Sequence, residues 1–271
     1  MRLLFLGDVV GRSGRDAVTK HLPQVRASLQ PDLVVVNGEN AAGGFGITEA
    51  ICQELHGAGT DVITTGNHVW DQRQIVSWLA ADARILRPCN FPTATPGRGA
   101  GVYTTARGRK VMVINAMGRI FMDPLDCPFA AIERELAPAR LGANVDAILV
   151  DFHAEATSEK MAMGHFLDGR VRLVVGTHSH VPTADAQVLN GGTAYQTDAG
   201  MCGDYDSVIG MVKAEPLQRF TKRLPTGRME AASGEATMCG TIVETDDATG
   251  RALRIAPVRL GGRLAPNLPD W

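Results

Sequence analysis

Short runs of apolar residues recur along the chain, and a polar turn that contains glycine follows most of them. Leucine and β-branched residues fill these runs without alternating polar positions, which is typical of strands buried on both faces. Five runs lead into turns with acidic, amide or imidazole side chains, and they cover residues 3–6, 33–36, 62–63, 147–150 and 173–175. We expect a strand at each of these five places.

Helical spacing of apolar residues separates several of these strands. Residues 18–29 predict a helix that Pro23 should kink or interrupt, and residues 48–55, 74–79 and 129–136 predict three more. Strands that alternate with helices indicate βαβ units, in which functional groups collect beyond the carboxyl ends of the strands. The five polar turns should therefore converge on the same side of the sheet.

Further strands are expected in the less regular parts of the chain. Residues 101–105 and 110–115 predict a strand pair, and residues 240–245 and 254–258 predict a hairpin. We expect these strands to build a second sheet layer rather than a second domain, because no long linker, repeat or low-complexity run divides the chain. The prediction is an α/β fold with a single domain over residues 1–271.

Composition excludes several classes of protein. Apolar residues make up 45% of the chain and charged residues 21%, which provides enough material for a core. The formal net charge of −2, from 27 basic and 29 acidic residues, does not indicate a nucleic-acid or membrane-surface binder. No apolar run reaches the length of about 18 residues that a transmembrane helix needs, and the first run is too short for a signal peptide. We expect a soluble, cytoplasmic protein.

Two familiar motifs are excluded by their spacing. The five cysteines are scattered and form no C-x-x-C pair, so they predict neither a disulfide framework nor a cysteine-rich zinc site. We expect them to be buried free thiols. The glycines of residues 11–15 lack the lysine of a phosphate-binding loop, and Ser13 is better explained as a helix N-cap.

Each polar turn has a structural explanation beside the chemical one. Asp8, and the adjacent Glu39 and Asn40, are as compatible with ordinary turns as with a binding site. Asn67 with His68 offers an oxygen ligand next to a titratable ring, and a structural histidine is the alternative.

The H-x-H sequence at residues 178–180 is the strongest local signal. In an extended segment, His178 and His180 project to the same side with Cα atoms roughly 6.6 Å apart. Each can then reach one of two metal ions about 3.5–4 Å apart. A chance pair is the alternative here, and a buried core histidine is the alternative for His153. The strand ends together offer carboxylates, amides and imidazoles without a thiolate, which suits Mn²⁺, Fe or Zn²⁺.

Three motifs, taken in order, resemble the signature of the calcineurin-like metallophosphoesterases. They are Gly7-Asp8, Gly66-Asn67-His68 and Gly176-Thr177-His178-Ser179-His180. Further motifs resemble the bacterial YmdB-like branch, a family of 2',3'-cyclic-nucleotide 2'-phosphodiesterases, at residues 7–11, 37–42, 66–68, 70–71, 151–160, 176–181, 197–198 and 205–206 and in the hairpin near the end. The resemblance implies a four-layer αββα sandwich with a site for two metal ions at the carboxyl ends of the strands.

The resemblance also implies a set of metal ligands in two groups. One ion would be held by Asp8, Glu39, Asn40 and His180, and the other by Glu39, Asn67, His153 and His178. The chain departs from the superfamily at Val10, where most members have a histidine, and at Glu39, where most have a bridging aspartate. In the YmdB-like branch, Asn40 takes the place of the missing histidine.

Charge counting supports phosphate chemistry at such a site. Two divalent ions with the carboxylates of Asp8 and Glu39 leave a positive balance even after a bridging hydroxide is added, and this balance attracts a phosphate anion. We predict that the hydroxide is the nucleophile and that His68 is the general acid. Asp71 either orients His68 or caps the following helix.

The predicted function is that of a metal-dependent phosphodiesterase that hydrolyses 2',3'-cyclic nucleotides. A phosphomonoesterase or nucleotidase with the same site, and a nucleotide-sensing regulatory protein, are the alternatives. The expected cofactors are two divalent ions, Fe or Mn first and Zn next. The expected partner is a small phosphodiester or nucleotide, with no membrane and no extended nucleic-acid surface; a homo-oligomer stays open. Residues 41–47 and 199–211 either border the pocket or use their glycines only for turns. Arg12, Arg15 or Arg119 would hold a phosphate oxygen unless they are surface arginines.

Overall fold

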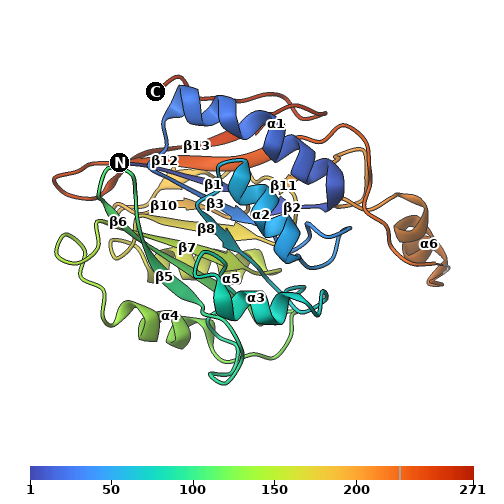
Figure 1. The fold of residues 1–271 in the computed structure, drawn as a ribbon, viewed down its shortest axis with the longest axis horizontal. Helices are drawn as coiled ribbons and strands as arrows, with labels where there is room; N and C mark the ends of the chain where they lie inside the picture. Colours follow the sequence, from blue (N-terminus) through green and yellow to red (C-terminus); the bar gives the residue numbers. More distant parts are fainter. Residues whose placement is uncertain (226) are drawn as a thin grey trace.

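A computed structural model describes residues 1–225 and 227–271, and two β-sheets form its centre (Figure 1). The first sheet has the strand order β13-β12-β1-β3-β4. Its strands are β1 (Arg2–Leu6), β3 (Leu33–Asn37), β4 (Val62–Thr64), β12 (Met238–Thr245) and β13 (Ala252–Leu260). Strands β1, β3 and β4 pair in parallel, whereas the hairpin of β12 and β13 is antiparallel to β1.

The second sheet has the strand order β5-β6-β7-β8-β10-β9. Its strands are β5 (Ala100–Thr104), β6 (Lys110–Met117), β7 (Ala147–His153), β8 (Leu173–Thr177), β9 (Gln187–Val188) and β10 (Ala194–Gln196). The four central strands run parallel, and β5 and β9 lie antiparallel at the two edges. A short parallel pair, β2 (Asp8–Val9) and β11 (Met201–Cys202), follows β1 outside both sheets.

Alternate residues of the central strands face two different apolar cores. Leu3 and Phe5 of β1 share a core with Leu149 of β7, which lies between the two sheets. Leu4 of β1 and Ile148 of β7 instead pack against the helices outside the sheets. Because both faces of each sheet are covered, these strands show apolar runs in place of polar alternation.

Helices cover the outer face of each sheet. Helices α1 (Gly11–Leu29), α2 (Glu49–Gly57) and α3 (Ile75–Ala81) pack on the first sheet, and α4 (Pro128–Leu136) and α5 (Thr157–Phe166) pack on the second. The result is a four-layer αββα sandwich, so the predicted fold class is confirmed. Helix α6 (Ala214–Lys222) instead projects away from the layers at one end of the molecule (Figure 1). No helix within the described residues combines the length and the apolar character needed to cross a membrane.

Three expectations about these elements are wrong. An interruption of α1 at Pro23 is one of them, because the helix runs from Gly11 to Leu29 with Leu22 and Val25 beside the proline fully buried under the first sheet. The helix begins at Gly11, so Ser13 is not its N-cap, and the Ser13 hydroxyl donates to the carbonyl of Ala232 at 3.0 Å. Of the two added strand pairs, β5 and β6 join the second sheet as expected. The hairpin of β12 and β13 instead extends the first sheet, because β12 pairs along the whole of β1.

Candidate metal centre

The candidate site lies where strands of both sheets end. Its polar turns follow β1, β3 and β4 of the first sheet and β7 and β8 of the second. The expectation of a single sheet is therefore wrong, and the site is shared between two sheets. Buried hydrogen bonds join them, because Asp151 Oδ2 of β7 accepts from Asn37 Nδ2 of β3 at 3.0 Å and from Thr64 Oγ1 of β4 at 2.5 Å.

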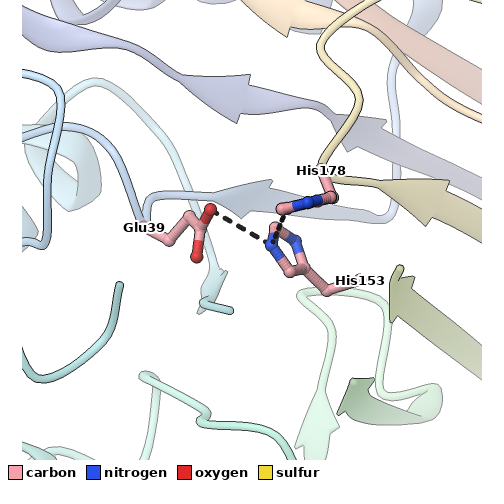
Figure 2. A group of neighbouring side chains, drawn as sticks. All are labelled: Glu39, His153 and His178. Carbon is pink, nitrogen blue, oxygen red and sulfur yellow. Dashed lines mark hydrogen bonds and ion pairs between the residues drawn. The ribbon is translucent and has the colours of Figure 1, made fainter. Parts of the chain in front are cut away.

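Two groups of side chains at this junction have the arrangement of metal ligands. Glu39, His153 and His178 form the first group, in which His153 Nε2 lies 3.1 Å from Glu39 Oε1 and 3.0 Å from His178 Nδ1 (Figure 2). Asp8, Glu39 and His180 form the second. In each group the candidate ligand atoms lie within 4.8 Å of one another. Glu39 belongs to both groups, as expected of a carboxylate that bridges two ions.

The two asparagines join the same groups. Asn67 Oδ1 lies 3.0 Å from His153 Nε2. Asn40 lies in the second group, with its Nδ2 3.0 Å from Glu39 Oε1 and 3.1 Å from His180 Nε2. All seven residues are thus brought together with the predicted division, although their role as ligands stays a prediction. Because an amide binds metal through oxygen, Asn40 would have to turn its amide to act as one.

Hydrogen bonds around the site hold the ring nitrogens that face away from it. The hydroxyl of Thr177 donates its one hydrogen to Asp151 Oδ1 at 2.7 Å. It therefore accepts the hydrogen bond from His153 Nδ1 at 2.9 Å. His180 Nδ1 donates to the carbonyl of Ile209 at 2.7 Å. The Nε2 atom of each ring therefore faces the carboxylates. Such partners on the far nitrogen are typical of histidines that bind metal.

Two buried oxygens support a cation at this place. Asp8 Oδ1 and Asn40 Oδ1 have no hydrogen-bond partner among the described residues. A buried polar atom without a partner costs about 1–3 kcal/mol, so native proteins rarely leave one. Asp8 is fully buried, and His153 Nε2 and His178 Nδ1 face each other across 3.0 Å. The residues fit divalent cations, which would provide partners for Asp8 Oδ1 and the two ring nitrogens, and for Asn40 Oδ1 once its amide is turned.

The pKa values of the site show its need for positive charge. Burial raises the pKa of Asp8. Burial opposes the ionisation of Glu39, but the charge and hydrogen bond of His153 lower the pKa of that carboxyl to about 2. Burial likewise disfavours a charged His153, but Glu39 raises its pKa to about 9. Burial, followed by the charge on His153, lowers the pKa of His178 to about 3. Burial thus disfavours charge on Asp8, while Glu39 and His153 stabilise each other's charged forms, so positive charge is favoured beside these carboxylates.

His68 lies beside these groups and outside both. Its Nδ1 lies 2.8 Å from Asp71 Oδ2, and its backbone N–H donates to Glu39 Oε2 at 3.1 Å. Helix α3 begins four residues after Asp71, with Gln74 at its N-cap, so the alternative of Asp71 as a helix cap is wrong. Asp71 instead orients His68, as the first alternative stated.

The backbone of the H-x-H sequence is not extended, which corrects the geometry expected for it. Strand β8 ends at Thr177, and φ is +95° at His178 and +66° at His180. Such angles cost energy outside glycine and persist where surrounding contacts impose them. Here the backbone N–H of His178 donates to Asp8 Oδ2 at 3.2 Å, and that of Ser179 donates to Asp198 Oδ2 at 3.1 Å.

Several supporting residues were not singled out from the sequence. Asp198 is buried and pairs with the buried Lys160 at 2.7 Å. Because Asp198 also accepts from the backbone N–H of Ser179, this pair holds the turn that carries both histidines. Glu155 Oε2 lies 3.2 Å from His178 Nε2. Both Lys160 and Glu155 belong to the 151–160 motif, and this was the signal available for them. Asp198 belongs to a shorter motif of the same resemblance, residues 197–198, which gave it no role.

A pocket of about 390 Å³ opens beside the candidate centre. Gly44 and Phe45 from residues 41–47, and Ile209 and Met211 from residues 199–211, line it, so these segments border the pocket, the first of the two alternatives. Of the arginines, Arg219 of α6 lines the described part of the pocket.

The three arginines suggested from the sequence lie elsewhere. Arg15 donates to the carbonyl of Ala41 and pairs with Glu54, and Arg12 is an exposed partner of Asp16. Arg119 is likewise exposed and does not line the described pocket. The surface alternative is therefore the correct one for Arg12 and Arg119, whereas the side chain of Arg15 is 15% exposed and supports the loop that begins at Ala41.

Two other features lie apart from the centre. All five cysteines are free thiols, and four of them are buried as predicted, whereas Cys127 is half-buried. A larger cavity of about 560 Å³ lies among Arg26, His56 and Tyr103, and it is lined by none of the predicted site residues.

The chain is similar to known proteins over nearly its whole length. Two solved structures resemble it closely. A protein from Thermus thermophilus has a TM-score of 0.90 at 43% identity, covering 97% of this chain and 100% of that one. A phosphatase from Mycoplasma pneumoniae has a TM-score of 0.89 at 32% identity, covering 96% of this chain and 93% of that one.

Sequence relatives agree with this likeness. A 2',3'-cyclic-nucleotide 2'-phosphodiesterase from Bacillus subtilis (strain 168) is 46% identical over 255 residues, which are 94% of this chain and 95% of that protein. Residues 4–258 match the family model for the YmdB-like protein. The chain therefore belongs to the YmdB-like family.

Proposed function

We propose that the chain is a phosphodiesterase that hydrolyses 2',3'-cyclic nucleotides at the ester bond to the 2' oxygen. The observation that carries the proposal is Glu39, a buried carboxylate common to two groups of ligand-type side chains. The B. subtilis relative named for this activity is 46% identical over nearly the full length of both chains, which supports the same substrate class.

The seven residues named above would hold two divalent ions. Asp8, Glu39, Asn40 and His180 would bind one ion, and Glu39, Asn67, His153 and His178 the other. Fe or Mn suits this set of carboxylate, amide and imidazole ligands best, with Zn next. Ions bound there would acidify water and withdraw charge from phosphoryl oxygens. A small phosphodiester anion is therefore the expected substrate.

His68 is the residue we assign to proton transfer. Hydrolysis adds the oxygen of one water molecule to phosphorus, breaks the bond from phosphorus to O2', and leaves a 3'-phosphate. The departing O2' needs a proton, and His68 lines the pocket without belonging to either ligand group. Asp71 holds Nδ1 at 2.8 Å, so Nε2 is the nitrogen left to donate. A positioned donor of this kind contributes about 10²–10⁴-fold in rate.

One assay separates this function from the alternatives. Protein purified without chelator and supplied with Mn²⁺ is given 2',3'-cyclic AMP, bis-p-nitrophenyl phosphate and p-nitrophenyl phosphate in parallel, and the nucleotide product is identified by chromatography. We expect turnover of the cyclic nucleotide to 3'-AMP. Preference for p-nitrophenyl phosphate would favour a phosphomonoesterase, and metal-replete protein that turns over none of the three would favour a nucleotide sensor.

Two further predictions remain proposals of the same kind. We propose that residues 1–271 form a single metallophosphoesterase domain, which the core shared by the two sheets supports. A cytoplasmic location is supported by the five free thiols, because reducing compartments keep cysteines unpaired.

A further inference from the structure

One part of the pocket beside the candidate metal centre is apolar. We call this part the apolar wall; it consists of Phe45, Ile209, Met211 and Met229. Ile209 is 53% exposed, so a large branched side chain faces solvent next to a cluster of charged and polar groups. Exposed apolar surface inside a pocket costs free energy unless a ligand covers it.

The backbone of Ile209 adds a second observation. Its φ is +47°, in the left-handed region, where a β-branched residue is a genuine outlier. Its carbonyl accepts the hydrogen bond from His180 Nδ1 at 2.7 Å. Ile209 is the first central residue of a two-residue turn, in which the backbones of Val208 and Met211 bond to each other in both directions at 3.0 Å and Gly210 follows with a φ of +92°. The contact with His180 fixes the position of Ile209 relative to the candidate centre.

The rest of the wall is held by packing. The ring of Phe45 meets the ring of His68 edge-on, with centroids 5.1 Å apart. Met211 belongs to a small buried cluster against which Phe45 and Met229 pack. A Cβ placed on Gly44 would come within 3.0 Å of Met211 Cε, so the loop that carries Phe45 lies directly against the wall.

We propose that the apolar wall is the subsite for the nucleobase, and that Ile209 is a residue that determines specificity for substrates carrying a base. The inference rests on the proposed function, which places the cyclic phosphate at the carboxylates and histidines. A base is planar and apolar on its faces, and it would lie within one ribose of the phosphate. Aromatic and thioether side chains are good partners for such a face. The wall itself offers only apolar side chains, so it recognises the face of the base rather than its edges.

The test compares two substrates that share the reacting group. Both 2',3'-cyclic AMP and glycerol 1,2-cyclic phosphate contain a five-membered cyclic phosphodiester, and only the first has a base. Ile209→Asn removes the apolar side chain, and asparagine tolerates the left-handed conformation. We expect the ratio of kcat/KM for the nucleotide to that for the glycerol ester to fall about tenfold, mainly through KM of the nucleotide.

Phe121→Asn is the matched control. Phe121 also has a left-handed φ, of +61°, and it is 88% exposed, but it does not line the described pocket. This variant should keep the ratio of the wild-type protein. Metal content and melting temperature are measured for both variants, and the melting temperature of Ile209→Asn should not fall.

Four results would overturn the inference. Unchanged kcat/KM values on both substrates in Ile209→Asn would show that the base does not contact the wall. An equal loss on both substrates, or a loss of metal, would assign Ile209 to the support of His180. A wild-type protein that hydrolyses the glycerol ester as well as the nucleotide would refute the subsite and leave the phosphodiesterase intact. A metal-replete wild-type protein that hydrolyses neither would refute the proposed function, and the subsite with it.

Discussion

The buried floor of the pocket and its exposed rim are built in different ways. The floor consists of the strand-end residues Asp8, Glu39, His153 and His180, which are at most 5% exposed. The rim consists of loops and of Arg219 from α6, and Ile209 on it is 53% exposed. Each ring nitrogen of the floor that faces away from the site has a partner, whereas the rim presents apolar side chains to solvent. The difference suggests that the floor performs the chemistry and the rim selects the substrate.

The largest expected effect is on the floor. Glu39→Ala removes the carboxylate common to both ligand groups, so the protein should lose at least one metal ion. Turnover should fall by more than about a thousandfold, which exceeds the loss caused by removing one hydrogen bond to a transition state. Elemental analysis gives the metal content. Glu133→Ala, which removes an exposed partner of Arg170, is the control and should keep both metal and activity. Two metal ions per chain in Glu39→Ala would contradict the bridging role.

His68 separates proton transfer from metal binding within the floor. His68→Ala should keep the metal content and lose about 10²–10⁴-fold in kcat. His165→Ala, at an exposed position near the end of α5, is the matched control. Full activity of the His68 variant with its metal in place would refute the general-acid role.

The support below the H-x-H turn should dominate stability. Lys160→Met leaves Asp198 as a buried charge without its partner at 2.7 Å, and the free energy of unfolding should fall by about 3 kcal/mol. Urea unfolding measures this loss. Lys222→Met, at an exposed position in the last turn of α6, should change it little. Equal stability of the two variants would mean that Ser179 and the backbone hold Asp198 without Lys160.

Glu155 lies at the boundary between floor and rim. Its carboxylate contacts His178 Nε2 at 3.2 Å and is half exposed, so Glu155→Ala should weaken metal binding by about tenfold, the lower end of such effects. Competition with a chelator measures the affinity, and Glu155→Gln, which keeps a hydrogen-bond acceptor, should recover part of it. Identical metal affinities in the wild-type protein and both variants would show that Glu155 does not support His178.

The smallest effect is expected on α6, beside the rim. Phe220 of α6 is 81% exposed, so Phe220→Ser should change the free energy of unfolding by less than about 0.5 kcal/mol and leave turnover intact. Sedimentation of both proteins tests the homo-oligomer at the same time. A lower mass in the variant would place α6 in an interface between copies of the chain and would contradict a free α6.

Local patterns in the sequence were sufficient for the strands and for the candidate ligands. Apolar runs mark β1, β3, β4, β7 and β8 because both faces of these strands are buried. Ligand-type residues follow each run, because strand ends are where polar groups can leave the core. The family resemblance added the division of the ligands into two groups, which the positions of the side chains match.

Local patterns in the sequence determined an α/β fold and the strand ends that carry the candidate ligands, since each depends on a short stretch of chain, whereas the four-layer sandwich and the role predicted for His68 came from the family resemblance. Only the tertiary structure decided how the candidate ligands meet. Two sheets share the site, and the histidines of the H-x-H sequence point to different groups because long-range contacts impose left-handed backbone at both. Asp198, Arg219 and the apolar wall also required the fold. They come from loops and from α6, whose positions depend on contacts between distant segments that no local period encodes.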